Sequence, residues 1–268
     1  MTVSVLDKII EDKKREVELL KQQKSIEQFK QEIMTLPRCR NFYKEVIKSN
    51  KRGINVIAEV KKASPSAGVI RANFNAVEIA KTYQKCGADA ISVLTDEKYF
   101  QGRLEDLTLV KNSVELPVLR KDFIIDPWQI YQSRAAGADA ILLIADCLNL
   151  GQLSDFLILS AELTLTVLLE VHSADVLLKV RSLIGFPKNG NSVLGINNRN
   201  LNTMEVDINT TSRLASLLEE DTPVVSESGI KTRADVEKLK RAGVKAVLIG
   251  QTLCESSDIE EKFKELFS

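Results

Sequence analysis

Charged side chains follow a short apolar run in the segment I-A-E-V-K-K-A-S-P-S-A-G at 57–68. Side chains alternate along an extended strand, so Ile57, Glu59 and Lys61 would share one face. An ionised Glu and a Lys on an inward face are costly to remove from water, and a plain core would not place them there. The pattern therefore indicates an acid–base site at the end of a strand. The alternative is a solvated ion pair on an edge strand.

Three more polar groups stand at the ends of later apolar runs. Lys121 ends L-R-K, Glu170 ends L-L-E, and Ser228 follows V-V-S-E. With Glu59 and Lys61 they supply two carboxylates, two ammonium groups and a hydroxyl. Neighbouring charges of this kind tune each other's pKa, as general acid–base catalysis requires. Each group alone could equally be an ordinary strand end that meets solvent.

Alternating apolar and amphipathic stretches provide the elements that would position these groups. From residue 54 a strand-then-helix pattern repeats along the chain. The expected strands cover 54–60, 89–94, 117–121, 139–144, 165–170, 193–197, 223–227 and 245–249. The expected helices cover 76–86, 103–112, 127–136, 149–161, 173–183, 207–219, 232–242 and 257–267. Short strands rich in Val, Ile and Leu are typical of a parallel sheet covered by helices.

Eight strands and eight helices predict an α/β fold, a single closed (β/α)8 TIM barrel. The length of 268 residues is close to the usual size of such a barrel. A weak repeat, C-G-A-D-A-I at 86–91 and A-G-A-D-A-I at 136–141, places a Gly between a helix and the next strand. The chain contains no GxGxxG or GxxxxGK[ST] segment that would favour an open sheet.

The domain prediction is one barrel domain over residues 1–268, in which residues 1–50 form a helical N-terminal extension. Amphipathic spacing predicts a helix over 4–23, a second from 26 to 34 and a third over 42–49. The charge run at 11–16 belongs to the solvated face of the first helix.

A barrel would bring the charged groups together, because active sites of such barrels lie at the carboxyl ends of the strands. Alternate strands contribute to one layer, so Glu59, Lys121, Glu170 and Ser228, from the first, third, fifth and seventh strands, are predicted to converge. The loops after the seventh and eighth strands, S-E-S-G at 226–229 and G-Q at 250–251, are the usual phosphate site.

Composition excludes several classes of function. Lys plus Arg and Asp plus Glu both number 37, so the zero net charge argues against a nucleic-acid or anionic-membrane binder. No apolar run is long enough to span a bilayer, and residues 1–20 lack the apolar core of a signal peptide. Four scattered cysteines without a CxxC pair, and one His, make a metal site unexpected and favour a reducing cytoplasm.

Four other side chains have two interpretations each. His172, just past Glu170, is expected to have a structural or loop role, because no nucleophile partner is visible. Trp128 is expected to pack rather than to bind. Phe100 and Phe123 stand near strand ends, where each could stack on an aromatic substrate or cap the core.

Six motifs together resemble the indole-3-glycerol phosphate synthase family of tryptophan biosynthesis. They are I-A-E-V-K-K-A-S-P-S-A-G at 57–68, S-V-L-T-D-E-K-Y-F-Q-G at 92–102, L-R-K-D-F-I-I-D at 119–126, L-L-E-V-H at 168–172, G-I-N-N-R-N-L at 195–201 and S-E-S-G-I at 226–230. The resemblance covers nearly the whole barrel in family order, and the N-terminal extension is similar too. It implies a carboxy-lyase that closes 1-(2-carboxyphenylamino)-1-deoxyribulose 5-phosphate to indole-3-glycerol phosphate, with loss of carbon dioxide and water.

The resemblance also implies roles. Lys121 resembles the general acid of ring closure, and Lys61 the lysine that contacts substrate anions and assists dehydration. Glu59 and Glu170 resemble the pair that stabilises the cationic intermediate and removes a proton. The remaining matches are hydrogen-bond partners of the reacting atoms (Asn197, Ser228), phosphate-side or substrate-side positions (Arg199, Gly229, Gly250, Gln251) and loop positions at the anthranilate end (Ser64, Phe100).

The implied partners are few. The resemblance implies a phosphorylated small-molecule substrate, no metal or organic cofactor, and neither nucleic acid nor membrane. We expect a cytoplasmic monomer, with weak association with other enzymes of the pathway left open.

Three positions depart from the family's usual residues: Gln251 where a smaller or acidic residue is expected, Asn198 where Ser is common, and Ser226 where Ala is frequent. Phosphate binding survives at Gln251 if it uses the backbone amide. Two other functions remain open. A phosphoribosylanthranilate isomerase would need a Cys or Asp acid–base pair, and the first strand carries no Cys. An inactive scaffold barrel would not need Glu59, Lys61, Lys121 and Glu170.

Overall fold

The strands of this computed structural model form one closed ring. The structure describes residues 4–187, 190–200 and 203–268. Within these ranges, eight parallel strands close into a barrel in the order β1-β10-β9-β8-β7-β6-β5-β4. They are β1 (Asn55–Val60), β4 (Ala90–Leu94), β5 (Val118–Lys121), β6 (Ala140–Ile144), β7 (Thr166–Val171), β8 (Ser192–Asn197), β9 (Val224–Glu227) and β10 (Ala246–Ile249). The predicted TIM barrel is confirmed, and each strand matches its expected range within two residues.

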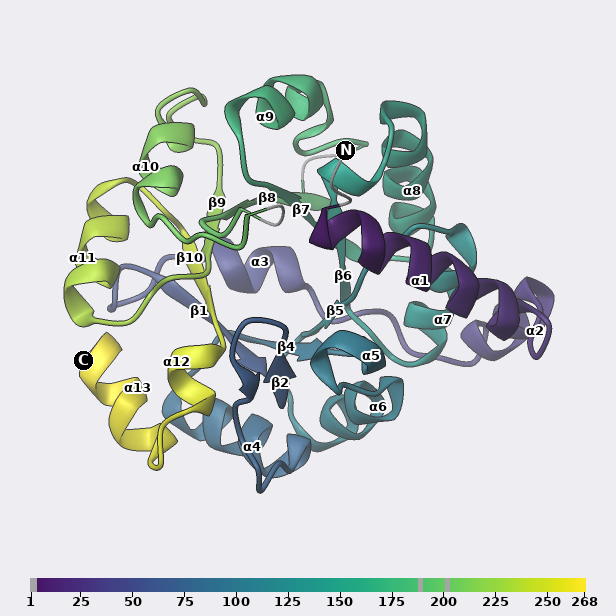
Figure 1. The fold of residues 1–268 in the computed structure, drawn as a ribbon, viewed down its shortest axis with the longest axis horizontal. Helices are drawn as coiled ribbons and strands as arrows, with labels where there is room; N and C mark the ends of the chain where they lie inside the picture. The colour runs from purple at the N-terminus through teal and green to yellow at the C-terminus, as the bar shows by residue number, and fades with distance from the viewer. Residues whose placement is uncertain (1–3, 188–189, 201–202) are drawn as a thin grey trace.

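Helices surround the ring and cover its outer face (Figure 1). They are α4 (Ala76–Cys86), α6 (Leu104–Ser113), α7 (Pro127–Ala135), α8 (Leu150–Glu162), α9 (Ala174–Val180), α10 (Asn209–Ala215), α11 (Arg233–Arg241) and α13 (Ile259–Phe267). The helix predicted over 173–183 is shorter and continues as the 3-10 turn η2 (Arg181–Leu183), and the helix predicted over 207–219 is also shorter. Gly87 ends α4 with a φ of 87°, a left-handed conformation that glycine adopts without strain.

Side-chain alternation divides the apolar residues into two groups. Outward residues such as Val56, Ile91 and Leu169 pack under the helices. Inward residues such as Ile57 and Leu168 fill the barrel interior. Each group is hydrophobic because the helices bury one face of the strands and the closed barrel buries the other. This alternation fixes which polar residues at the strand ends point inward.

The N-terminal extension has three helices, two of which cover the ends of the barrel. The three helices are α1 (Val5–Lys21), α2 (Ile26–Ile33) and α3 (Phe42–Ile47). Phe42 and Val46 of α3 are fully buried in the interior cluster and close the amino-terminal end of the barrel. Leu6 and Ile9 of α1 join the same cluster at the opposite end. Helix α1 itself lies in front of β6 in Figure 1. The extension therefore contributes to the core at both ends.

Short elements that the sequence pattern did not predict lie in the loops at the carboxyl ends of the strands. These are the hairpin β2 (Ala63–Ser64) with β3 (Gly68–Val69), the helices α5 (Glu97–Phe100) and α12 (Gln251–Cys254), and the 3-10 turn η1 (Ala145–Cys147). Segments of two to four residues are too short to show a period. No helix in the described part of the chain is long and apolar enough to cross a membrane.

Candidate active site

All twelve residues that the sequence analysis selected line one pocket at the carboxyl end of the barrel. They are Glu59, Lys61, Ser64, Phe100, Lys121, Glu170, Asn197, Arg199, Ser228, Gly229, Gly250 and Gln251. The predicted convergence is therefore seen in the structure. Leu201, the last residue of the fifth matching motif, lies outside the described residues.

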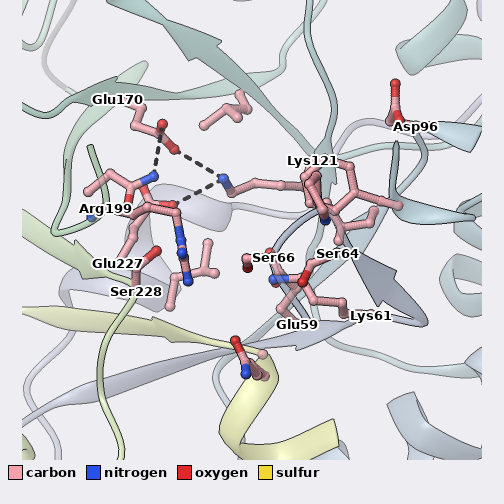
Figure 2. A pocket seen from close by; sticks show the side chains of 18 of the residues that line it. Glu59, Lys61, Ser64, Ser66, Asp96, Lys121, Glu170, Arg199, Glu227 and Ser228 are labelled. Atoms are coloured by element: carbon pink, nitrogen blue, oxygen red, sulfur yellow. Dashed lines mark hydrogen bonds and ion pairs between the residues drawn. The ribbon is translucent and has the colours of Figure 1, made fainter. Parts of the chain in front are cut away.

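Lys121 reaches from the end of β5 across the pocket to two carboxylates (Figure 2). Its Nζ lies 3.0 Å from Glu170 Oε2 and 3.3 Å from Glu227 Oε2. Asn197 Nδ2 donates to the other oxygen of Glu170 at 3.1 Å. Glu170 therefore has both oxygens engaged, which fixes its carboxylate beside the ammonium group.

The electrostatics of this cluster keep Lys121 charged. Burial alone would lower the pKa of the ammonium group, but the nearby carboxylates of Glu170, Glu227 and Glu59 outweigh it and raise that pKa. An ammonium group held in this way is a strong hydrogen-bond donor and stabilises negative charge that develops on a substrate oxygen.

Glu59 and Lys61 form a second pair on the adjacent side of the pocket. Both project inward from β1 and its end, as the alternation predicted, and Lys61 Nζ makes an ion pair with Glu59 Oε1. The Glu59 side chain is 3% exposed, whereas that of Lys61 is 17% exposed. An almost buried carboxylate thus lies beside an ammonium group that a ligand can reach.

Glu227 is the main residue that the sequence analysis missed. We placed Ser228 in the layer with Glu59, Lys121 and Glu170, but on β9 the inward side chains are Val225 and Glu227. Ser228 lines the pocket from the loop beyond the strand. The period-two alternation of the strand indicates this residue, because a side chain two positions after an inward Val also points inward.

Glu227 is a buried carboxyl group with a raised pKa. Its side chain is 2% exposed, and within the described residues neither oxygen accepts a hydrogen bond of good geometry. Burial raises the pKa of the Glu227 carboxyl to about 8, and the charge of Glu170 adds to this, against the opposing effect of Lys121. A carboxyl group of this kind holds a proton near neutral pH and can release it there.

The loops after β9 and β10 form the end of the pocket where the sequence predicted a phosphate. Ser228 and Gly229 have φ values of 68° and 77°, so two successive residues adopt the left-handed conformation. Non-glycine residues in this conformation are strained and are common at functional sites. Gln251 begins α12, and its side-chain amide donates to Glu255 Oε2 at 3.3 Å. The Gln251 side chain is thus engaged within its own helix.

Arg199 lies on the same side, in the loop after β8. Its Nη1 donates to the carbonyl of Met204 at 3.0 Å, and burial lowers the pKa of its guanidinium group. The two remaining departures from the family pattern contact each other, because Asn198 Nδ2 donates to Ser226 Oγ at 3.1 Å. Asn198 Nδ2 also donates to the carbonyl of Ser228 at 3.0 Å and so supports the turn.

Apolar side chains build the opposite wall. Phe100 and Phe123 both line the pocket, with ring centroids 6.2 Å apart. Leu6 and Ile9 of α1 complete this wall, which no local pattern around residue 9 could indicate. Both phenylalanines therefore face the pocket beside α1.

A buried ion cluster holds α1 over the pocket. Lys13 Nζ lies 2.9 Å from Asp96 Oδ2 and 3.0 Å from Asp122 Oδ1, in the loops after β4 and β5. The Lys13 side chain is 1% exposed, and its neighbour Arg120 also contacts Asp122 at 3.1 Å. The helix is therefore fixed to the loops that carry Phe100 and Phe123.

His172 and Trp128 have structural contacts. The His172 ring contacts Asp146 Oδ2 at 2.9 Å, in the neighbouring loop. Trp128 is buried against Phe29 at a centroid distance of 5.2 Å, which confirms its packing role. Among the described residues, no group of three or more His, Cys, Asp or Glu side chains is arranged to hold a metal ion.

A closed parallel barrel with acids and bases gathered at the carboxyl ends of its strands defines an enzyme of the (β/α)8 class. The solved structures with this fold include 3-hexulose-6-phosphate synthase from Salmonella typhimurium (TM-score 0.62, 12% identity, 80% of this chain and 96% of that chain). They also include orotidine 5'-phosphate decarboxylase from Pyrococcus horikoshii (TM-score 0.57, 12% identity, 79% of this chain and 97% of that chain). At these identities the similarity shows the fold alone.

Sequence comparison identifies the family. The indole-3-glycerol phosphate synthase family model matches residues 6–266. The indole-3-glycerol phosphate synthase of Endomicrobium trichonymphae is 45% identical over 262 residues, 98% of this chain and 99% of the relative. The synthase of Desulforamulus reducens is 42% identical over 263 residues, which cover 98% of this chain and 96% of the relative. The chain belongs to the indole-3-glycerol phosphate synthase family, as its motifs predicted: lyases of tryptophan biosynthesis that act on a phosphorylated small molecule.

Proposed function

We propose that this chain closes the indole ring of indole-3-glycerol phosphate, with Lys121 as the general acid. The substrate is 1-(2-carboxyphenylamino)-1-deoxyribulose 5-phosphate. The observation that supports this most is the position of the Lys121 ammonium group, 3.0 Å from Glu170 and 3.3 Å from Glu227 in a pocket that all twelve selected site residues line.

Ring closure joins the aromatic carbon that carries the carboxylate to the ketone carbon of the sugar chain. The ketone oxygen takes a proton from Lys121 as the new bond forms, which avoids a free alkoxide. The ring becomes cationic until carbon dioxide leaves. Glu170, which accepts a hydrogen bond from Asn197, supplies a carboxylate that stabilises the cation. Glu227 lies on the other side of Lys121 and can return a proton to it.

Dehydration follows and requires an acid and a base. Lys61 and Glu59, already paired, can supply both: Lys61 protonates the leaving hydroxyl, and Glu59 takes the proton that restores the aromatic ring. Ser228 serves as a hydrogen-bond partner of the reacting atoms.

The two ends of the pocket suit the two ends of this substrate. Gly229, Gly250, Gln251 and Arg199 take the phosphate, in the loops that commonly bind phosphate in such barrels. Ser64 and Phe100 receive the anthranilate ring against α1. We further infer one catalytic domain, residues 1–268, with residues 1–50 as its helical extension. We infer a cytoplasmic monomer as well, in line with its scattered free thiols.

A turnover assay tests the proposal. The purified chain is given the carboxyphenylamino substrate, and indole fluorescence is followed. The proposal expects fluorescence to rise with wild type. No rise with this substrate, or consumption of phosphoribosylanthranilate in its place, would contradict it.

A further inference from the structure

Two glycines, one in a barrel strand and one just after a strand, stand where a side chain would otherwise point at a pocket carboxylate. Gly195 lies in β8 and Gly250 just after β10. A glycine in the interior of a strand costs about 0.5–1 kcal/mol relative to alanine, and it often marks a close approach of another group. Neither residue has a positive φ, so the backbone conformation does not require glycine at either position.

The space above Gly195 is taken by Glu227. A Cβ atom at residue 195 would overlap Glu227 Oε1 and would lie 3.1 Å from Leu168 Cδ1. Gly195 pairs in register with Val225 of β9 and with Glu170 of β7, so it lies between the strands of both carboxylates that face Lys121. The Glu227 side chain leans from the end of β9 toward Gly195.

Gly250 stands in the same relation to Glu59. A Cβ atom there would overlap Glu59 Oε1 and would lie 3.0 Å from Glu59 Cβ. Each of these two glycines is therefore next to a Glu on the neighbouring strand.

We propose that Gly195 is a positioning residue for the reaction, because the missing side chain lets the Glu227 carboxylate lie beside Lys121. The inference rests on the proposed function for the meaning of that pair. It goes beyond that function in assigning a role to a residue that touches neither substrate nor Lys121.

The first test replaces Gly195 with alanine. A Cβ atom would push the Glu227 carboxylate back by about 1 Å, and misplacements of that size cost about 100-fold in rate. We expect Gly195→Ala to lower kcat about 100-fold with KM nearly unchanged, because the phosphate end of the pocket is untouched. An unchanged kcat in a folded variant would overturn the proposal.

A double-mutant cycle tests whether the substitution at Gly195 acts through Glu227. Once Glu227→Ala has removed the carboxylate, Gly195→Ala should lower kcat by less than about threefold further. The matched control is Leu168→Val, which relieves the other close neighbour of the new Cβ atom and should leave the full loss in place. Additive losses with Glu227→Ala, or recovery with Leu168→Val, would show that Gly195 acts through core packing instead.

A crystal structure of Gly195→Ala separates failure of this inference from failure of the proposed function. The distance from Lys121 Nζ to Glu227 Oε2 is 3.3 Å in the wild-type chain. In the variant we expect that contact to be broken, with the barrel otherwise unchanged. This result needs no turnover, so it stands even if the substrate is different. An intact contact would contradict the positioning role whatever the activity.

Discussion

Replacement of Lys13 by Met should release α1 from the barrel. The lysine has nearly the same length as Met, so the apolar stem is kept and the charge is lost. Lys13 neutralises Asp96 and Asp122, whose side chains are only 2% and 1% exposed. Without it, Asp122 retains Arg120 at 3.1 Å, but Asp96 loses its cation.

The size of the effect follows from burial. Removal of one partner from a buried ion pair typically costs about 3–5 kcal/mol, because the remaining charge stays out of water. Burial alone would lower the pKa of Lys13, yet Asp122 and Asp96 raise it, so the ammonium group is charged throughout the usual pH range. We therefore expect a loss of about 3–5 kcal/mol, either in the free energy of global unfolding or in the free energy with which α1 docks onto the barrel.

Trp128 provides the assay. It is the sole tryptophan of the chain and packs with Val17 of α1 and Phe29 of α2. Urea unfolding followed by its fluorescence should shift to lower urea in Lys13→Met, and KM should rise because Leu6 and Ile9 leave the pocket wall. Lys14→Met, at the exposed neighbouring position, is the matched control and should behave like wild type. A Lys13→Met variant within about 1 kcal/mol of wild type would refute the reasoning.

Three further predictions concern the charged cluster. Lys121→Met should fold, as judged by circular dichroism, and lose at least about 100-fold in kcat, the usual scale of a general acid; near wild-type turnover would remove that assignment. Glu59→Gln should lower kcat steeply with a modest change in substrate binding, and a change confined to KM would mean that Glu59 only positions the substrate. The raised pKa of Glu227, about 8 against an ordinary 4.5, means that the folded state keeps a proton which the unfolded state loses near pH 4.5. The contribution of this group to the free energy of unfolding is thus fully present below about pH 4.5 and is lost as the pH rises to about 8. Across that window the free energy of unfolding of wild type should fall relative to that of Glu227→Gln. Parallel pH dependence of urea midpoints for the two proteins would contradict the shift.

Local periodicity was enough to predict the barrel. Each strand is a short apolar run bounded by polar residues, and period-two alternation around Ile57 correctly put Glu59 and Lys61 inside. The same rule applied to Val225 would have selected Glu227, but we followed the serine of the motif rather than the register. The inward direction of Glu227 is therefore predictable from the strand register.

Other parts of the site depend on contacts between distant residues. The ion pair of Lys13 with Asp96 spans 83 positions of the chain, and the sequence shows only an amphipathic helix with a charged face. We placed the charge run at 11–16 mostly on the solvated face, which holds for the exposed Lys14 and Arg15, whereas Lys13 points into a buried cluster. The space that Gly195 leaves for Glu227 is equally invisible, since it depends on the side-chain direction of a neighbouring strand.

A crystal structure with indole-3-glycerol phosphate bound tests the central claim most directly. The account predicts the phosphate against Gly229 and Gly250, the indole ring between Phe100 and α1, and the Lys121 ammonium group within hydrogen-bond distance of the reacting end. A product bound elsewhere, or with its phosphate beside Phe100 and its ring beside Gly250, would contradict it.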